Sequence, residues 1–233
     1  MTPCEHDKSR LRESLGPRPP VFARAGRAAE RLRRLAAYRR ARVVLVMPDE
    51  VLLQVRINVL GDGKSLIAAT PGLKQGLVRL TPGQVPVARR RRDLAGGSLF
   101  KAGTHLHFPQ ARLGRVDLVV GAVLAVDRQG HTLGDGRGIL DLTYALLAHL
   151  GALSPHTPLA VIAAPEQLRE HLPSNPWDVR AGIIVTPDQV LTPPVRQPRS
   201  SLDRLPPRLA TLPVVRAVRE RLGRERRAQG TRS

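Results

Sequence analysis

The chain has 233 residues, a length that suits one α/β domain or one domain with a tail. Its 38 basic residues outnumber 19 acidic ones, and the net charge of +19 favours an anionic partner such as nucleic acid, anionic lipid or a polyanionic small molecule. Aromatic residues make up only 3% of the chain, which argues against an RNA-recognition sheet, and no apolar run reaches the about 18 residues that a membrane span needs.

The N-terminal residues, MTPCEHDKSRLRES (1–14), are charged and lack the apolar stretch of a signal peptide. Cys4 is the only cysteine, so no intramolecular disulfide can form, and a reducing compartment is the default. We therefore expect a cytoplasmic protein with no membrane partner. Cys4 itself lies in a terminus that is expected to fray, which makes it a poor candidate nucleophile.

The first part of the chain predicts helices and strands in alternation. Residues 27–40 (RAAERLRRLAAYRR) carry apolar residues at helical spacing, with arginines on the other face. RVVLVM (42–47) has the composition of a strand. The residues after PDE (48–50) predict a helix that ends at GDG (61–63), and SLIAAT (65–70) predicts the next strand.

Two groups of polar residues follow in the middle of the chain. RRRRD (89–93) lies in loop-like surroundings and is predicted to be a solvated basic loop, with an RNA-binding run as the functional alternative. His105 and His107 are alternate residues of one predicted strand, so their side chains are expected on the same side. Because no third ligand is near them in the sequence, a metal site at this pair is not favoured.

The second half continues the same alternation. VDLVVGAVLAV (116–126) predicts a buried strand, which leads through the turn DRQG (127–130) into a glycine-rich stretch. Residues 139–150 then place apolar side chains at helical spacing. Further along, two strands and a short helix are predicted: PLAVIAA (158–164), PEQLREHL (165–172) as the helix, and AGIIVTP (181–187).

Strands that alternate with helices predict an α/β fold: a single Rossmann-like domain with a mainly parallel sheet flanked by helices. We expect an N-terminal arm over residues 1–20 and the α/β domain over 21–190. A Pro- and Arg-rich extension with a short helix is expected over 191–223, and a disordered basic tail over 224–233.

The glycine-rich stretch LGDGRGILDLTY (133–144) is the first candidate site. It follows a predicted buried strand and precedes a predicted helix, a place where α/β proteins often bind an anion. Its GxGxG spacing matches neither the GxGxxG of dinucleotide loops nor the GxxxxGK[ST] of Walker loops. From the pattern alone, the stretch is either a turn or a cradle for phosphate.

Several motifs in chain order resemble the 5-formyltetrahydrofolate cyclo-ligase family, also called methenyltetrahydrofolate synthetase. AVDRQGHTLGDGRGILDL (125–142) resembles the family's aFDxxGxRLGxGxGYYDR, and Gln167, LP (172–173), WD (177–178) and IIVT (183–186) resemble its second motif. KSRLR (8–12) resembles the N-terminal KxxLR. The resemblance implies a fold shared with sugar-phosphate isomerases and CoA transferases.

The likeness is closer to one branch, the methenyltetrahydrofolate synthetase domain-containing proteins and their bacterial relatives. GRAAERL (26–32) and VLVMPDEVLLQVRINVLGDGKSLIAATPGLKQGL (44–77) follow the first half of that branch, and GDGRGILDLTYA (134–145) follows its loop position by position. The resemblance covers roughly residues 8 to 215.

The resemblance implies an ATP- and Mg²⁺-dependent enzyme of folate and one-carbon metabolism. In such enzymes the formyl oxygen of 5-formyltetrahydrofolate attacks the γ-phosphate of ATP. The activated formyl carbon is then captured by a neighbouring nitrogen as phosphate leaves, which gives 5,10-methenyltetrahydrofolate. Phosphoryl transfer of this kind needs charge neutralisation, magnesium and alignment rather than covalent help from the protein.

Site residues follow from the resemblance, position by position. The residues implied to bind the nucleotide are Lys8, Arg12, Gly134, Asp135, Gly136, Arg137 and Gly138. Asp141 and Asp178 match the family's magnesium-linked aspartates, and Arg137 and Asp141 are the implied catalytic residues. The implied substrate-binding residues are Glu50, Gly138 and Ile139. From the residues alone, the favoured explanations are a helix N-terminal charge for Asp141 and a turn residue for Asp178, and the resemblance is what favours the metal site.

Three departures from the family pattern weigh against cyclo-ligase activity. Ile139 and Leu140 replace a pair of tyrosines, Leu142 replaces an arginine, and Trp177 replaces a histidine. The alternative function is a non-catalytic member of the same fold that binds a nucleotide or RNA through the phosphate loop and the basic surface. Under the first function the basic surface also suits polyglutamylated folate; the sequence leaves open whether the protein is a monomer or a dimer.

Overall fold

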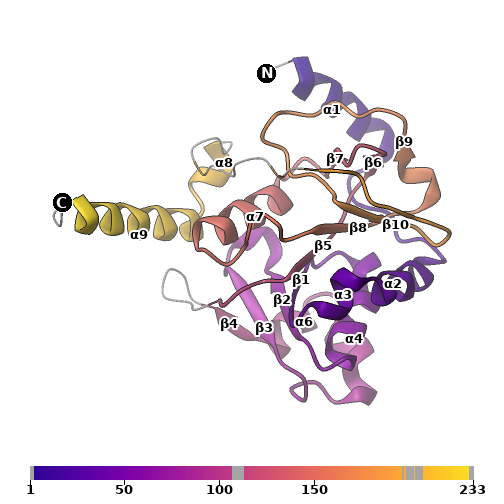
Figure 1. The fold of residues 1–233 in the computed structure, drawn as a ribbon, viewed down its shortest axis with the longest axis horizontal. Helices are drawn as coiled ribbons and strands as arrows, with labels where there is room; N and C mark the ends of the chain where they lie inside the picture. The colour runs from indigo at the N-terminus through magenta and orange to yellow at the C-terminus, as the bar shows by residue number, and fades with distance from the viewer. Residues whose placement is uncertain (1–2, 107–112, 196, 198–201, 203–206, 231–233) are drawn as a thin grey trace.

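The computed structural model describes residues 3–106, 113–195, 197, 202 and 207–230. Its centre is an eight-stranded sheet with the order β11-β10-β8-β5-β1-β2-β3-β4 (Figure 1). The strands are β1 Val43–Val46, β2 Ser65–Ala69, β3 Leu77–Leu80, β4 Thr104–Leu106, β5 Leu118–Ala122, β8 Leu159–Ile162, β10 Ile183–Val185 and β11 Val190–Leu191.

The five central strands, β10, β8, β5, β1 and β2, pair in parallel, and the edge strands β11, β3 and β4 are antiparallel. Every residue of β8 and β10 is buried, as are the last three of β1, which is why these strands read as continuous apolar runs in the sequence. The predicted α/β fold with a mainly parallel sheet is confirmed.

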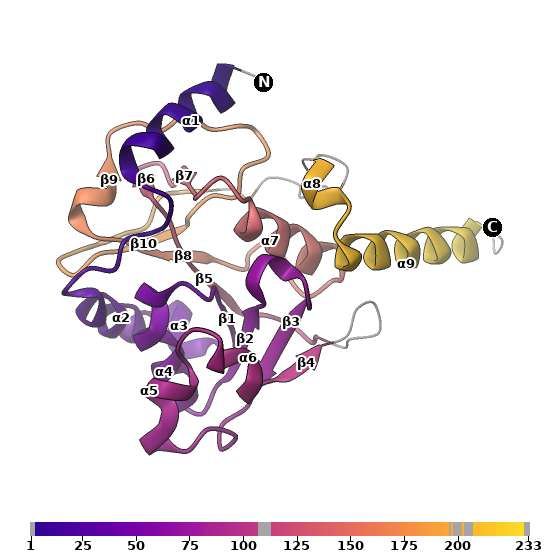
Figure 2. The same cartoon turned by 180° about the vertical axis from the view of Figure 1, so that it is seen from behind.

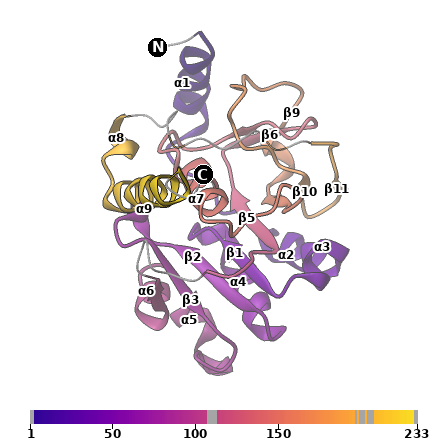
Figure 3. The ribbon, with the colours of Figure 1, turned by 60° about the vertical axis from the view of Figure 1, so that its left-hand side comes forward.

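Helices cover both faces of the sheet (Figure 3). On one face, α2 (Ala25–Arg34) packs on β8 and β10, and α4 (Leu53–Gly61) packs on β1, β2 and α2. On the other face lies α7 (Ile139–His149), whose Leu140 contacts the backbone of Gly121 in β5. The prediction of one helix over 27–40 is wrong, because Leu35 is extended (φ −70°, ψ 145°) and separates α2 from α3 (Ala36–Arg40).

A small second sheet with the order β7-β6-β9 lies beside the large one. Its strands are β6 Ala125–Asp127, β7 Thr132–Leu133 and β9 Leu168–Arg169. The N-terminal arm forms helix α1 (Pro3–Leu15), and its Leu11 and Leu15 pack against a buried cluster that includes Leu133 and Leu172. Folding of the arm onto this sheet brings α1 to the end of the molecule where the glycine loop lies (Figure 1).

Two further predictions of secondary structure are wrong. Residues 116–126 form two strands in different sheets, β5 and β6, because the chain crosses between the sheets at Val123 and Leu124, which are buried. PEQLREHL (165–172) is not a helix: a single 3₁₀ turn, η4 (Pro165–Gln167), leads directly into β9.

RRRRD (89–93) is not a loop: it spans the end of a 3₁₀ turn, η3 (Val87–Arg89), and the one-turn helix α5 (Arg90–Asp93). The remaining short elements are η1 Glu50–Leu52, η2 Pro71–Leu73, α6 Ser98–Ala102 and α8 Pro207–Ala210. His105 lies on β4, whereas His107 lies outside the described residues.

The C-terminal extension ends in α9 (Pro213–Gly230), which projects from the body of the molecule (Figure 2). Val214, Val215 and Val218 anchor its first turns in the core. Residues 224–230, for which the sequence predicts disorder, are described as the end of this helix. None of the described helices is long and apolar enough to cross a membrane.

Candidate functional site

The glycine loop, residues 134–138, connects β7 to α7 and lies between α1 and α8. Gly136 and Gly138 have φ values of +83° and +70°, a region that side chains disfavour. A Cβ atom at Gly136 would lie 3.3 Å from Cδ of Arg12, and one at Gly138 would lie 3.1 Å from Cδ1 of Leu209. The loop is therefore confined on two sides, and both positions require glycine.

Within the described part of the chain, backbone N–H groups at the start of α7 have no hydrogen-bond acceptor. Gly138 is the N-cap, in a left-handed conformation and with no side-chain cap. None of the described residues accepts a hydrogen bond from the N–H groups of Gly138, Ile139 or Leu140. Free N–H groups at a helix start carry partial positive charge and bind anions. The geometry therefore suits a phosphate.

Helix α1 brings two cations to this loop. The Arg12 side chain crosses Gly136 and donates from Nε to the carbonyl oxygen of Gly134 at 3.1 Å. Lys8, one turn earlier, is only 4% exposed, and its Nζ lies 2.5 Å from Oδ2 of Asp178. Both cations were predicted as nucleotide-binding residues, and the structure brings both together with the rest of the candidate site.

A backbone hydrogen bond links Asp141 to the segment that carries Asp178. Oδ1 of Asp141, in the first turn of α7, accepts a hydrogen bond from the N–H of Val179 at 3.0 Å. Oδ2 of Asp178 accepts from the N–H of Asn175 at 2.6 Å and from Lys8. Burial raises the pKa of Asp141, and the charge of Asp178 adds to that rise while Lys8 opposes it. Lys8 thus pairs directly with Asp178, and its charge also acts on Asp141.

The donor set of this carboxylate pair fits Mg²⁺ with a nucleotide. Magnesium usually takes one or two protein carboxylates and completes its octahedron with water and substrate phosphates. The described residues contain no group of three or more His, Cys, Asp or Glu side chains that could hold a metal without such help. Asp141 and Asp178 thus supply the number of protein ligands that a magnesium–nucleotide complex uses.

Arg137 is held inside the loop rather than free. Its Nε donates to Oδ2 of Asp135 at 2.6 Å, and its backbone N–H donates to Oδ1 of the same residue at 2.9 Å. Asp135 therefore fixes the turn and neutralises the guanidinium, whose side chain is 58% exposed. To bind a phosphate, Arg137 has to exchange this partner.

The loop after β1 contributes Asp49 rather than Glu50 to the neighbourhood of the glycine loop. Glu50 is exposed. Burial raises the pKa of Asp49; the charge of Asp135 adds to that rise, and the cations Arg56 and Arg137 oppose it. Sequence reasoning missed Asp49, although the PDE motif that it interpreted contains this residue.

The residues that replace the family's side chains take structural positions. Leu142 is fully buried in the core, and Leu140 packs on Gly121 of β5. Ile139 is partly buried against the same core. Trp177 is 42% exposed, in the segment next to Asp178. No hydroxyl or charge is therefore present at the positions where the family pattern has tyrosines and arginine.

Two polar residues within the matched motifs stabilise the fold. Asp127 is fully buried and accepts hydrogen bonds from three backbone N–H groups and from Nδ1 of His131. Gln167 accepts from the N–H of Ala164 and donates to the carbonyl oxygens of Val123 and Leu124. Gln167 holds the crossing between the two sheets, and Asp127 holds the turn after β6 and the backbone at Leu172, so their place in the motifs has a structural explanation.

Comparisons with known proteins agree with this arrangement. The model of the 5-formyltetrahydrofolate cyclo-ligase family matches residues 7–187. A methenyltetrahydrofolate synthase domain-containing protein of Bos taurus is 34% identical over 199 residues, which cover 78% of this chain and 50% of the relative. A protein of the same description from Homo sapiens is 31% identical over 198 residues, with the same two shares.

The chain thus spans about half the length of these curated relatives. The NMR structure of Aquifex aeolicus 5,10-methenyltetrahydrofolate synthetase superposes with a TM-score of 0.55 at 20% identity, covering 82% of this chain and 94% of the other, a likeness of fold. The family match extends from the cations of α1 to the end of β10 and includes both aspartates. The chain belongs to the 5-formyltetrahydrofolate cyclo-ligase family.

Proposed function

We propose that this protein is an ATP- and Mg²⁺-dependent cyclo-ligase that converts 5-formyltetrahydrofolate to 5,10-methenyltetrahydrofolate. The observation that carries the proposal is the contact of Lys8 with Asp178, 170 positions apart, beside Asp141 and the glycine loop. Three separate segments supply these groups, and each group suits a magnesium–nucleotide complex. The family consists of ATP-dependent enzymes that act on this substrate.

The phosphates of ATP are assigned to the start of α7. The N–H groups of Gly138, Ile139 and Leu140 donate hydrogen bonds to the anion, and Arg12, which lies across Gly136, adds a guanidinium from the α1 side. Asp135 and Arg137 are paired with each other within the loop. When phosphate arrives, Arg137 exchanges its carboxylate partner for a phosphate oxygen and stabilises the charge that develops during transfer.

The local charge balance favours magnesium. The side chains described here include five carboxylates, Glu5, Asp49, Asp135, Asp141 and Asp178, against the four cations Lys8, Arg12, Arg56 and Arg137. Lys8, Arg12 and Arg137 are already paired with carboxylates, so they leave little positive charge to meet that of a polyphosphate. A magnesium ion held by Asp141 and Asp178 would supply positive charge here and neutralise charge on the transferring phosphoryl group.

Glu50, Gly138 and Ile139 are the proposed contacts to folate. Glu50 is exposed after β1, at the carboxyl end of the parallel strands, where ligands of open α/β sheets bind. Ile139 follows the left-handed Gly138 at the start of α7. Because Ile139 lacks a hydroxyl, it offers an apolar contact to the pterin side of the substrate rather than a hydrogen bond to the formyl oxygen.

The test follows the absorbance of the methenyl product with 5-formyltetrahydrofolate, Mg²⁺ and ATP. The wild-type protein should give a signal that requires ATP, and Asp141→Asn should lower kcat/KM by at least about a hundredfold. Asp141→Asn keeps an oxygen that can accept the Val179 N–H, so the fold is retained while the charge is lost. Asp93→Asn, which removes an ion pair on α5, is the matched control and should keep full activity.

The second candidate function is nucleotide binding without folate chemistry. It is favoured by the burial of Leu142 and by the packing of Leu140 on Gly121, because these positions carry no group that could orient a formyl oxygen. A wild-type protein that binds Mg–ATP but gives no methenyl product with any concentration of 5-formyltetrahydrofolate would support this function and contradict the first.

A further inference from the structure

A basic surface lies along α2, on the face of the sheet opposite to α7. It consists of two adjoining hollows of about 610 and 500 Å³, which share Glu30 and Arg34 as a common wall. Six basic side chains line the pair, and we call this surface the α2 furrow: Arg27, Arg31, Arg33, Arg34, Arg39 and Lys64.

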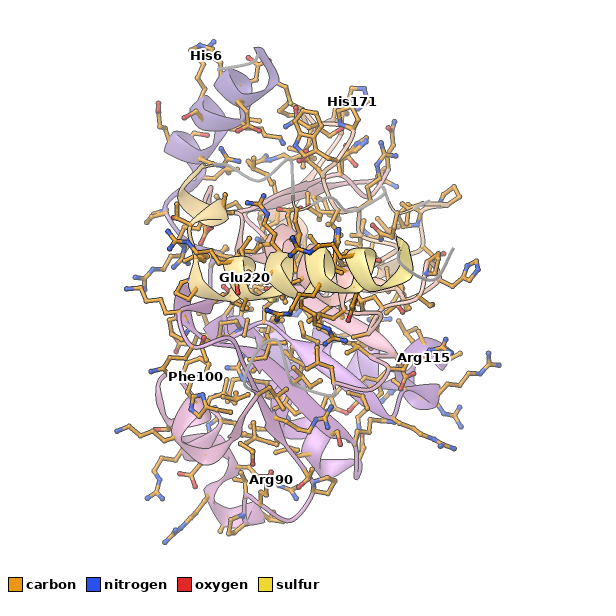
Figure 4. The ribbon with its side chains drawn as sticks, turned by 90° about the vertical axis from the view of Figure 1, so that its left-hand side faces the viewer. His6, Arg90, Phe100, Arg115, His171 and Glu220 are labelled. Carbon is orange, nitrogen blue, oxygen red and sulfur yellow. The ribbon has the colours of Figure 1, made fainter. Side chains whose placement is uncertain are left out.

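The furrow is separate from the glycine loop. The larger hollow includes Arg39, which lies in α3 four residues before β1 begins at Val43, and Lys64, which immediately precedes β2. The larger hollow therefore lies at the amino ends of these parallel strands, whereas ligands of the fold bind at their carboxyl ends. The smaller hollow reaches Val190, which pairs with Val185 at the carboxyl end of β10, and it lies beside α2 on the face of the sheet opposite to α7 (Figure 3). In Figure 4, Arg115, which precedes β5 at the amino edge of the sheet, lies well below His6 of α1.

Part of the furrow is held rigid by its own ion pairs. Asp62 accepts hydrogen bonds from Nε of Arg33 at 2.8 Å, from Nη2 of Arg33 at 2.5 Å and from the hydroxyl of Tyr38 at 2.9 Å. Lys64 donates to the carbonyl oxygen of Ala41 at 2.6 Å. These contacts also occupy the acidic residues, since Glu30 accepts from Asn58 and from Arg33.

The remaining cations of the furrow have no carboxylate partner. Arg27, Arg34 and Arg39 are exposed, and none of them forms an ion pair with any residue of the described chain. Arg31 donates a hydrogen bond from Nη2 to the carbonyl oxygen of Pro187, but its buried Nε has no hydrogen-bond partner in the described part of the protein. Arg27, Arg31 and Arg34 are spaced i, i+4, i+7, which aligns them along one side of α2.

We propose that the α2 furrow binds the sugar-phosphate backbone of a nucleic acid. Two successive hollows that meet at Arg34 and at Glu30, whose carboxylate is occupied by Asn58 and Arg33, suit a polymer whose negative charge repeats better than a single small anion. The cations are arginines, whose planar guanidinium binds phosphate oxygens in pairs. Leu35 and Val190 are the only apolar side chains in the described lining, and both are partly buried, so the surface offers little to a lipid bilayer or to a peptide that docks through apolar anchors.

Binding of this kind depends on contacts to phosphates and not on contacts to bases. The furrow's one aromatic residue among those described, Tyr38, is 1% exposed and donates its hydroxyl to Asp62, so it is not available for stacking on a base. We therefore expect affinity that depends strongly on salt and weakly on sequence.

The test measures fluorescence anisotropy of a labelled oligouridine at several salt concentrations. The triple variant Arg27→Gln, Arg34→Gln, Arg39→Gln removes three exposed cations that make no side-chain contact recorded in the described chain, so the fold should be retained. Its affinity should fall by about tenfold or more at low salt. The slope of log K against log salt should become shallower by about 2, because each phosphate contact on a single strand contributes about 0.7.

The matched control removes the same charge elsewhere: Arg89→Gln, Arg91→Gln, Arg92→Gln, on η3 and α5. It should retain most of the wild-type affinity and slope. Equal losses in both triple variants would mean diffuse attraction to a +19 protein and would overturn the proposal. Absence of oligouridine binding by the wild type at low salt, or full displacement of the oligouridine by phosphatidylserine vesicles or by polyglutamate, would also overturn it.

Discussion

At the scale of single residues, Lys8 is the centre of the candidate site. Its ammonium group is buried against Asp178, next to Asp141, at the position where a divalent cation would satisfy the same carboxylates. A buried amine is costly unless it is paired, and removal of either partner leaves an uncompensated charge. In the proposed site, Lys8 stabilises the carboxylate pair in the free protein and would bind a phosphate once magnesium is held by the carboxylates.

Lys8→Met should increase the shift in Tm that Mg²⁺ causes in the absence of nucleotide. Without the ammonium group, Asp141 and Asp178 repel each other, so the variant should have a lower Tm than the wild type in metal-free buffer. Addition of millimolar Mg²⁺ should raise the Tm of Lys8→Met more than that of the wild type, because the cation binds the folded state only. Differential scanning fluorimetry measures both quantities.

Lys101→Met is the control, because Lys101 is exposed on α6 and its loss should leave the response to Mg²⁺ unchanged. Equal magnesium-dependent shifts in wild type and Lys8→Met would show that the carboxylate pair does not bind the metal. The shift is measured without ATP, so it is independent of turnover.

At the scale of elements, the glycine loop depends on contacts from both ends of the chain. Arg12 of α1 lies against Gly136, and Leu209 of α8 lies against Gly138. The arm and the extension, both expected to lie outside the α/β domain, thus each cover one side of the loop. The start of α7 is positioned by these two helices as well as by the sheet.

Gly138→Ala and Gly134→Ala should differ in their effect on the free energy of unfolding. Gly138 has a left-handed φ and its Cβ would meet Leu209, so alanine there should lower the free energy of unfolding by about 1–2 kcal/mol. A Cβ at Gly134 meets nothing within 4 Å, so that substitution should change the free energy of unfolding by less than about 0.5 kcal/mol. Urea denaturation compares the two.

Gly134→Ala should nevertheless weaken ATP binding if phosphate approaches the loop backbone, since the new methyl group takes part of the open space. A Gly134→Ala protein with wild-type ATP affinity would argue that the nucleotide does not approach this part of the loop. Full stability of Gly138→Ala would show that the α8 contact is not formed in solution.

The sequence predicted well those strands whose apolar run in the sequence corresponds to a single strand of the structure. β1, β2, β8 and β10 are buried runs of the right length between polar segments. The pattern failed where burial continues across a break: Val123 and Leu124 are buried between two strands of different sheets. It failed also at Leu35, because nothing in the local sequence there marks the end of a helix.

The candidate site likewise contains features that the sequence predicted and features that it did not. The glycine loop is readable from its residues and position, whereas the contact between Lys8 and Asp178 spans 170 positions and follows only from the likeness to a family. Asp49 was passed over in favour of Glu50, because adjacent acidic residues cannot be ranked until the direction of the backbone after β1 is known. The α2 furrow was not predicted, since its cations become neighbours only when α2, α3 and the turn before β2 pack together.

At the scale of the whole molecule, the sheet separates two kinds of charge. Carboxylates and a few cations surround the glycine loop at the start of α7, and an excess of arginine lines the α2 furrow on the opposite face. The net charge of +19 therefore does not describe the candidate nucleotide site, where acidic groups are in the majority. The α2 furrow, with six basic and two acidic side chains in its described lining, carries part of that excess.

The central claim is that α1, the glycine loop, Asp141 and Asp178 form one Mg–ATP site, and calorimetric titration with ATP tests it most directly. The account predicts binding to the wild type in the presence of Mg²⁺, much weaker binding when EDTA replaces it, and loss of binding in Asp141→Asn but not in Asp93→Asn. Unchanged ATP affinity in Asp141→Asn, or affinity that is indifferent to Mg²⁺, would contradict it.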